Sequence, residues 1–137
     1  MDESKFFSIQ HAQSGSISEV NATAYLLELN DISYRTILFS DKPNRIVKSV
    51  STLDFIENWT IGENNFAIDP PTAVLVVDEQ EQDVAIVELF NPVYDIEKKT
   101  LKYNISPDNL TSIDVTGDYG QNILLIDPTG GSDPTQA

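Results

Sequence analysis

The feature of this sequence that most limits its fold is a series of short apolar runs, rich in β-branched and aromatic residues and separated by turn-forming residues. Runs at intervals of about 8–12 residues are typical of antiparallel sandwiches and barrels. The expected strands are 5–12, 20–29, 36–39, 73–77, 84–90, 101–105, 113–115 and 123–126. We therefore predict an all-β fold, an antiparallel β-sandwich or barrel with one short helix. A ferredoxin-like α+β fold is the alternative, but it requires a second helix that the sequence does not show.

The predicted helix lies at about residues 51–60, between two turns. Ser51 or Thr52 can cap it, Asp54 adds negative charge to its first turn, and Gly62 is a suitable end. At 100° per residue its apolar side contains Leu53, Phe55, Ile56 and Trp59, and its polar side contains Asp54, Glu57 and Asn58. The pattern predicts that Trp59 is buried against Phe55, Ile56 and the strand at 73–77.

Turns are predicted wherever Gly, Pro, Asn and Asp gather, because these residues tolerate or fix the backbone angles of turns. The expected positions are Gln13–Ser16, Asn30–Asp31, Ser40–Pro43, Asp69–Pro71, Asn91–Pro92, Asp95–Lys98 and Gly117–Gly120.

The stretch around the helix also contains a longer motif. It runs from Phe39-Ser-Asp-Lys-Pro-Asn-Arg45 through Phe55, Trp59, Gly62 and Phe66 to Asp69-Pro-Pro-Thr-Ala73. This run resembles the pattern FSDRP–R, F, W, G, F, DPPNA of an uncharacterised family of secreted archaeal and bacterial proteins, over residues 16–126. Lys42 and Thr72 depart from it, standing where the family has Arg and Asn. The resemblance implies a secreted protein and supplies no catalytic residue.

The composition of the chain limits its partners and its compartment. The net charge of −14 and the pI of about 4.1 argue against nucleic acid and against anionic membranes, since both would be repelled. The charge serves solubility or, alternatively, weak association with divalent cations.

Without Cys there is no disulfide framework and no Cys-ligated zinc, and no stretch reaches the ~20 apolar residues of a membrane span. Met1–Lys5 has no apolar signal core, so the chain is either cytosolic or the mature form of a secreted protein; the family resemblance favours secretion.

Residues with catalytic or metal-binding potential are few. His11 is the only imidazole, no nucleophile motif accompanies it, and we expect it to be an ordinary strand residue. A glycosidase pair among the 22 carboxylates stays possible, because sequence does not reveal their separation. Asp41 and Asp69 are better explained as turn residues than as ligands of a shared cation. We expect no catalytic residue, no metal and no cofactor.

Four Asn-X-Ser/Thr sequons are the one modification signal, at Asn21, Asn58, Asn104 and Asn109. Asn58 falls on the polar side of the predicted helix and Asn104 on the outward side of its strand. If the chain is secreted, these residues are candidate glycosylation sites.

Three functions are compatible with these features. The favoured one is a secreted, non-catalytic β domain of the cell surface or extracellular matrix that could assemble into a filament. The alternatives are an extracellular carbohydrate- or ligand-binding module and a small acid-residue hydrolase. We expect a segment at 1–15 that pairs with a sheet edge of its own or another copy, a β domain at 16–126 and a flexible tail at 127–137. The expected partners are copies of the chain and glycans, without nucleic acid or membrane insertion.

Overall fold

The structure is a computed structural model that describes residues 6–21, 24–40, 45–61, 65–77, 83–107 and 117–128. Its strands are β1 (Phe6–Asn21), β2 (Ala24–Ile32), β3 (Arg35–Ser40), β4 (Val47–Ser51), β5 (Thr72–Val77), β6 (Asp83–Asp95), β7 (Thr100–Pro107), β8 (Gly117–Tyr119) and β9 (Asn122–Asp127). One α-helix, α1 (Thr52–Glu57), continues into a 3-10 helix, η1 (Asn58–Thr60).

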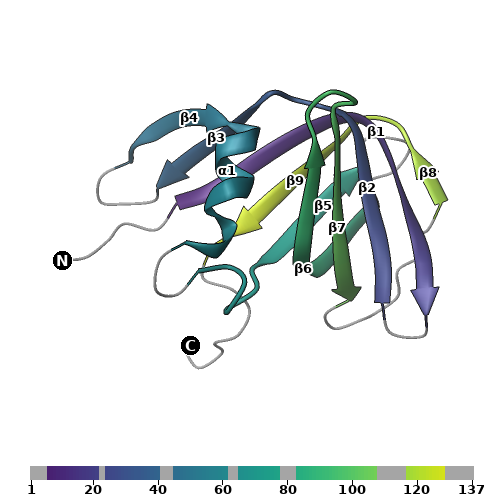
Figure 1. Ribbon diagram of the computed structural model, residues 1–137. Helices are drawn as coiled ribbons and strands as arrows, with labels where there is room; N and C mark the ends of the chain where they lie inside the picture. The colour runs from purple at the N-terminus through teal and green to yellow at the C-terminus, as the bar shows by residue number, and fades with distance from the viewer. Residues whose placement is uncertain are drawn as a thin grey trace.

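All the strand pairs are antiparallel, and six strands form a closed ring (Figure 1). The order β2-β7-β6-β5-β9-β1 returns to its start because the second half of β1 also pairs with β2. The first half of β1 extends past the ring and pairs with β3, and β3 pairs with β4. The predicted all-β fold with one short helix is confirmed, in its barrel form.

The hydrophobic core fills the ring. Along the regular parts of the ring strands, alternate side chains point inward, as the two-residue period of a strand requires. The fully buried ones include Leu27, Leu29, Leu75, Leu89, Leu101, Tyr103, Ile105, Leu124 and Ile126. Because side chains occupy the interior, any binding site must lie outside the ring or at its ends.

Strand β1 is the longest element, and it does not break at Gln13–Ser16 as predicted. Gly15 is not a turn residue: a Cβ on it would lie 2.8 Å from the carbonyl oxygen of Glu28 on β2. The glycine therefore permits a close approach of β1 and β2. In the structure Phe6–Ile9 pairs with β3 and Ser8–Ala12 pairs with β9, so this segment lies within its own sheet.

Two predicted turns lie inside strands instead. Asp31 in β2 and Asn91 in β6 have φ of 55° and 49°, and the strands continue past them. The register of β6 shifts between Phe90 and Val93, which marks a bulge. Asn and Asp tolerate positive φ, so here they bend a strand rather than end it.

Other boundaries also differ from the prediction. Val20 belongs to β1 and not to the following strand, which begins at Ala24. Strand β4 was not predicted, and Gly117–Tyr119 forms the short strand β8 where a turn was expected. The turn after Asp95 is confirmed, since its Oδ1 accepts hydrogen bonds from the backbone N–H groups of Glu97 and Lys98. The expected strand 113–115, the turn at 41–43 and Gly62 lie outside the described residues.

The helix begins where the sequence predicted. The Ser51 hydroxyl accepts a hydrogen bond of 3.0 Å from the backbone N–H of Asp54, as an N-cap does. Its apolar side is rotated from the prediction, because Leu53 is exposed and Thr52 is completely buried. Helix α1 contacts β3, β4 and β6 at one end of the barrel (Figure 1).

Candidate binding groove beside Trp59

Trp59 is the centre of an aromatic cluster between the helix and the barrel. It is only 4% exposed, so its predicted burial is confirmed. Its ring centroid lies 4.9 Å from that of Phe66 and 5.7 Å from that of Tyr103. Phe55 meets it edge-on at 6.2 Å. Such tilted and edge-to-face contacts are the favoured arrangements of aromatic rings, so the cluster holds the indole in one position.

A buried chain of hydrogen bonds joins the barrel core to the helix. The Tyr103 hydroxyl donates to Gln10 Oε1 at 2.8 Å, and Gln10 Nε2 donates to Thr36 Oγ1 at 3.4 Å. Thr52 Oγ1 lies 2.9 Å from Thr36 Oγ1 and donates to the carbonyl oxygen of Ser33. Since the Thr52 proton is used there, Thr36 is the donor between the two hydroxyls. The chain fixes α1 to β1, β3 and β7 without leaving these hydroxyl groups unsatisfied.

Burial also affects the acidity of Tyr103. The side chain is fully buried, and the loss of hydration raises the pKa of its hydroxyl far above the ordinary value. Tyr103 therefore acts as a neutral hydrogen-bond donor in the folded protein.

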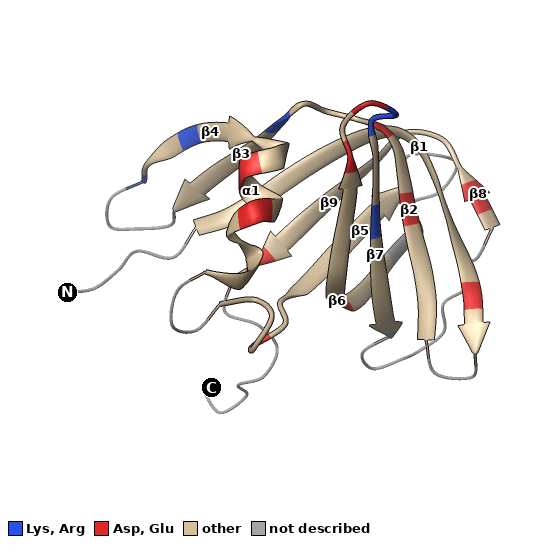
Figure 2. Cartoon of the chain, in the orientation of Figure 1, with Lys and Arg blue, Asp and Glu red and all other residues tan. Residues whose placement is uncertain are grey.

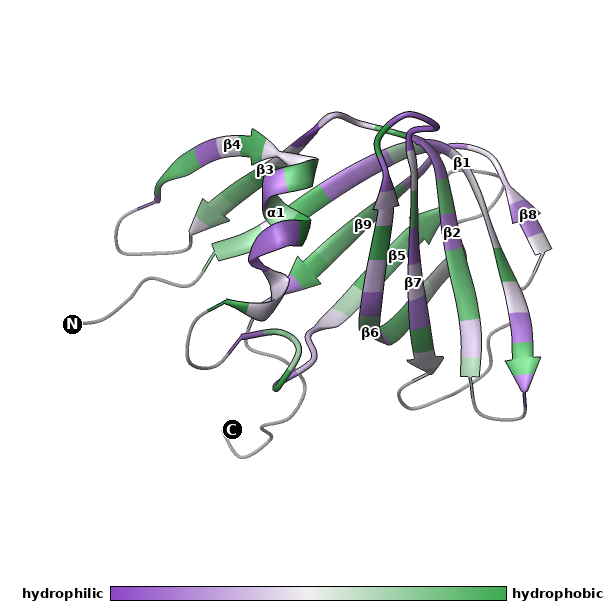
Figure 3. Ribbon diagram, viewed as in Figure 1, coloured by the Kyte–Doolittle hydropathy of each residue, from purple (hydrophilic) through white to green (hydrophobic). Residues whose placement is uncertain are grey.

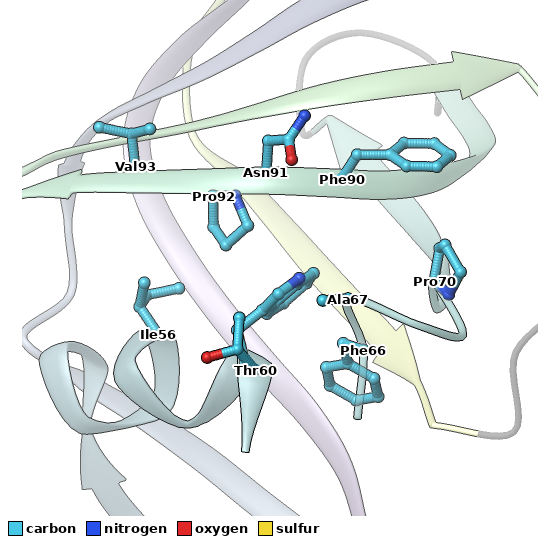
Figure 4. Close-up of a pocket in the computed structure, with 10 residues that line it drawn as sticks. Ile56, Thr60, Phe66, Ala67, Pro70, Phe90, Asn91, Pro92 and Val93 are labelled. Carbon is cyan, nitrogen blue, oxygen red and sulfur yellow. The ribbon is translucent and has the colours of Figure 1, made fainter. Parts of the chain in front are cut away.

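A groove of about 350 Å³ lies on one side of Trp59 (Figure 4). The helical segment, the 66–70 loop and the bulge of β6 form its walls. Its lining consists of Ile56, Trp59, Thr60, Phe66, Ala67, Pro70, Phe90, Asn91, Pro92 and Val93. Thr60, Asn91 and Trp59, through its indole N–H, are the lining residues whose side chains can form hydrogen bonds. The groove is therefore an uncharged, mainly apolar depression with three hydrogen-bonding side chains.

A second hollow, of about 270 Å³, also lies against Trp59 and Phe66. It is lined by Phe6, Ser8, Leu38, Val50, Phe55, Asn58, Trp59, Phe66 and Pro128. Trp59 and Phe66 thus contribute to both depressions.

The three sequon asparagines in the described residues are not part of one site. Asn21 is exposed at the end of β1. Asn58 is exposed, donates to the Asp54 carbonyl oxygen at 3.0 Å and borders the second hollow. Asn104 is half-buried, and its Oδ1 accepts from Asn91 Nδ2 at 3.3 Å. Asn109 lies outside the described residues.

The other candidate residues also lie apart. His11 is a half-buried strand residue opposite Ile123, and it is not among the residues lining either hollow. Asp69 lies at the end of a turn, where its N–H donates to the Asn65 carbonyl oxygen, while Asp41 lies outside the described residues. In the described part of the chain, no three His, Asp or Glu side chains gather as metal ligands do.

The sequence singled out Ile56 and Trp59 as core residues and Phe66 as part of the motif run, but it did not predict a groove. Phe90, Pro92 and Val93 reach the groove because β6 bulges there. The available signal was Asn91-Pro92 interrupting an apolar run, which we interpreted as a turn.

Comparison with family models, curated proteins and solved structures finds no match for this chain. Neither of the helices in the described ranges has the length and apolar composition needed to cross a bilayer. The proposed function therefore rests on the residues and geometry of the chain and, for secretion, also on the motif run that resembles secreted proteins.

Proposed function

We propose that the chain is a secreted, non-catalytic β domain of the cell surface or extracellular matrix, and that the groove beside Trp59 binds an uncharged apolar group. The lining of the groove supports this proposal. Its volume of about 350 Å³ is within the range of small-molecule sites, which are mostly apolar with a few polar groups. Two prolines and a packed aromatic cluster border it, so binding would cost little ordering of the protein.

The chemistry of the lining favours an aromatic or aliphatic ligand group. A charged group would lose its hydration there without gaining an ionic partner. A carbohydrate, which the sequence leaves open, presents several hydroxyls, and the lining offers only three side chains that form hydrogen bonds, those of Thr60, Asn91 and Trp59.

Binding is favoured over catalysis for a similar reason. General acid–base catalysis uses an ionisable side chain beside the substrate, most often His, Asp, Glu or Lys. Within the described chain, none of the residues lining either hollow is ionisable at neutral pH. A hydrolase would need a site elsewhere.

The sole tryptophan allows a direct test of the groove. Nile red, a neutral apolar dye, should bind saturably and accept excitation energy from Trp59. Ala67→Phe, at an exposed lining position, should fill the groove and weaken binding at least about tenfold, whereas the neighbouring Ile68→Phe, outside the lining, should not. Absence of saturable transfer, or equal binding by the two variants, would refute the groove as the site.

Secretion is tested separately, on protein from its native source. The resemblance to secreted proteins and the exposed sequons Asn21 and Asn58 support glycosylation. The intact mass should exceed that of the bare polypeptide, and Asn21→Gln should remove one glycan. A mass equal to the bare chain would contradict this part of the proposal.

Self-assembly by strand donation stays a prediction. Because residues 6–12 lie between β3 and β9, a donated strand would have to replace this segment rather than extend an edge. The neighbour's Gln10 would then have to rebuild the hydrogen bonds to Tyr103 and Thr36. Exchange of this kind predicts dimers or filaments that form slowly and persist after dilution.

A further inference from the structure

The outer surface of the sheet contains a continuous row of apolar side chains. In register across five strands, Ile37 pairs with Ile9, Ile9 with Leu125, Leu125 with Val74, and Val74 with Ile86. Further apolar residues lie beside this row. We call the set the outer apolar face: Phe7, Ile9, Ile37, Phe39, Val47, Val74, Val76, Ile86, Ile123 and Leu125.

This face is open to solvent in the described structure. Val47 is 71% exposed and Ile86 53%, and Ile37, Val76 and Ile123 are also exposed. With strands about 4.8 Å apart and residues about 3.4 Å apart, the face measures about 24 by 14 Å. This is comparable to the largest apolar patch on a typical monomer, about 300–600 Å², and such patches are often functional.

The apolar character is confined to one half of the sheet. On the same side of β1, Phe7 and Ile9 are followed by His11, which pairs with Ile123 at the border of the face, and then by Ser14 and Ser16. Ser16 pairs with Glu28 on one side and Asp118 on the other. Figure 3 shows the same contrast between β9, which is largely hydrophobic, and β8, which is hydrophilic. The face is therefore a local feature rather than a general property of the surface.

The charges around the face indicate what covers it. Arg35 lies at one corner, on the same side of β3 as Ile37. At the opposite corner Thr72 pairs with both Asp127 and Glu88, which places two carboxylates there. Figure 2 shows the basic residues of the β3–β4 region beside the acidic residues of α1, with other acidic residues farther along the sheet. When two such faces pack together, the arginine corner of each can lie over the acidic corner of the other.

We propose that the outer apolar face is the interface with a second copy of this chain, in a two-fold symmetric dimer. The face is self-complementary in charge, as a symmetric contact requires. Two chains of net charge −14 repel each other, and the central row brings no carboxylate into the contact. The same repulsion disfavours an anionic membrane as the occupant. The contact closes on itself and therefore yields dimers rather than filaments.

Sedimentation equilibrium of the intact chain over a range of concentrations tests the interface. The chain should show a reversible monomer–dimer equilibrium that is strengthened by salt, because salt screens the net repulsion. Ile86→Glu should weaken dimerisation at least about tenfold, since it buries a charge in the contact. Val20→Glu is the matched control: Val20 is 57% exposed but lies at the end of β1, outside the face. Circular dichroism establishes that both variants fold.

A charge reversal tests the corners. Arg35→Glu and Glu88→Arg should each weaken the dimer, and the double variant should recover much of the loss.

A chain that stays monomeric at all concentrations, or a dimer equally stable in Ile86→Glu and Val20→Glu, would overturn the proposal. A dimer made by strand exchange would survive Ile86→Glu. The groove is independent of this face, so Ala67→Phe should still dimerise whether or not the groove binds a ligand.

Discussion

At the level of single residues, buried polar side chains explain how the helix is fixed to the barrel. Gln10, Thr36, Thr52 and Tyr103 are all buried, and each makes at least one hydrogen bond to another member. Removing Tyr103 or Gln10 leaves a buried polar atom of the other without a hydrogen bond, which costs about 1–3 kcal/mol. The position of Trp59 therefore depends on polar groups in the core as well as on apolar packing.

Stability at alkaline pH should report on Tyr103. Burial raises the pKa of Tyr103 in the folded state, so above the ordinary tyrosine pKa of about 10 the unfolded chain releases a proton that the folded chain retains. The free energy of unfolding should be insensitive to this group below about pH 10 and should fall as pH rises further.

Urea unfolding between pH 8 and 11.5 measures this dependence. Tyr103→Phe should be less stable by about 1–3 kcal/mol at pH 8, because Gln10 loses its donor, and should show a shallower alkaline decline. Part of the decline should remain, since burial also raises the pKa of Tyr94. Identical slopes in the two proteins would mean that Tyr103 is not buried as described.

Truncation of Trp59 should be costly. Trp59→Ala should lower the free energy of unfolding by about 3–5 kcal/mol, as large aromatic truncations in cores do. Leu53→Ala, on the exposed side of the same helix, should change it by no more than about 0.5 kcal/mol. The emission of the native protein gives an independent check, because an indole emitting as in water would contradict burial of Trp59.

At the level of elements, the bulge in β6 shapes the groove. It reverses the regular alternation of side chains between Phe90 and Val93, and so brings Phe90, Pro92 and Val93 to the lining. Asn91 adopts φ of 49° to make this possible. Bulges are typical next to functional sites because they redirect side chains.

Two substitutions of Asn91 distinguish the contribution of its backbone conformation to stability from that of its side-chain hydrogen bond. Asn91→Val should destabilise the protein by about 1–2 kcal/mol and weaken Nile red binding, because a β-branched residue resists positive φ. Asn91→Gly tolerates the conformation and loses mainly the hydrogen bond to Asn104. Equal stability of the two variants in chemical denaturation would show that the bulge is not strained in this way.

The sequence predicted the strand content because apolar alternation is local, and most predicted strands overlap observed ones. The prediction was wrong where the same residue types are compatible both with a turn and with a continuous strand. Asn30-Asp31 and Asn91-Pro92 are turn residues that bend continuous strands, and Gly15 permits a close strand contact. Strand β4 (Val47–Ser51) is short and partly polar, so it has no clear periodicity. The groove was not predictable because its lining comes from segments far apart in sequence.

At the level of the whole molecule, closure of the ring accounts for the location of both proposed surfaces. A filled interior leaves no room for a ligand. The candidate groove therefore lies at one end of the barrel, between the helical segment, the 66–70 loop and β6. The outer apolar face lies on strands of the ring and on the β3–β4 extension. Ligand binding and association with a second copy can therefore occur independently on one rigid scaffold.

The most direct test of the proposed function is a backbone-amide NMR titration of the intact chain with benzyl alcohol, a small neutral aromatic molecule. We expect saturable shift changes confined to the groove, at Ile56, Phe66, Ala67, Asn91 and Val93 and at the Trp59 indole. Ala67→Phe should abolish these changes and Ile68→Phe should not. Shift changes that do not saturate, or that fall on Ile37, Val76 and Ile86 instead of the groove, would contradict the proposal.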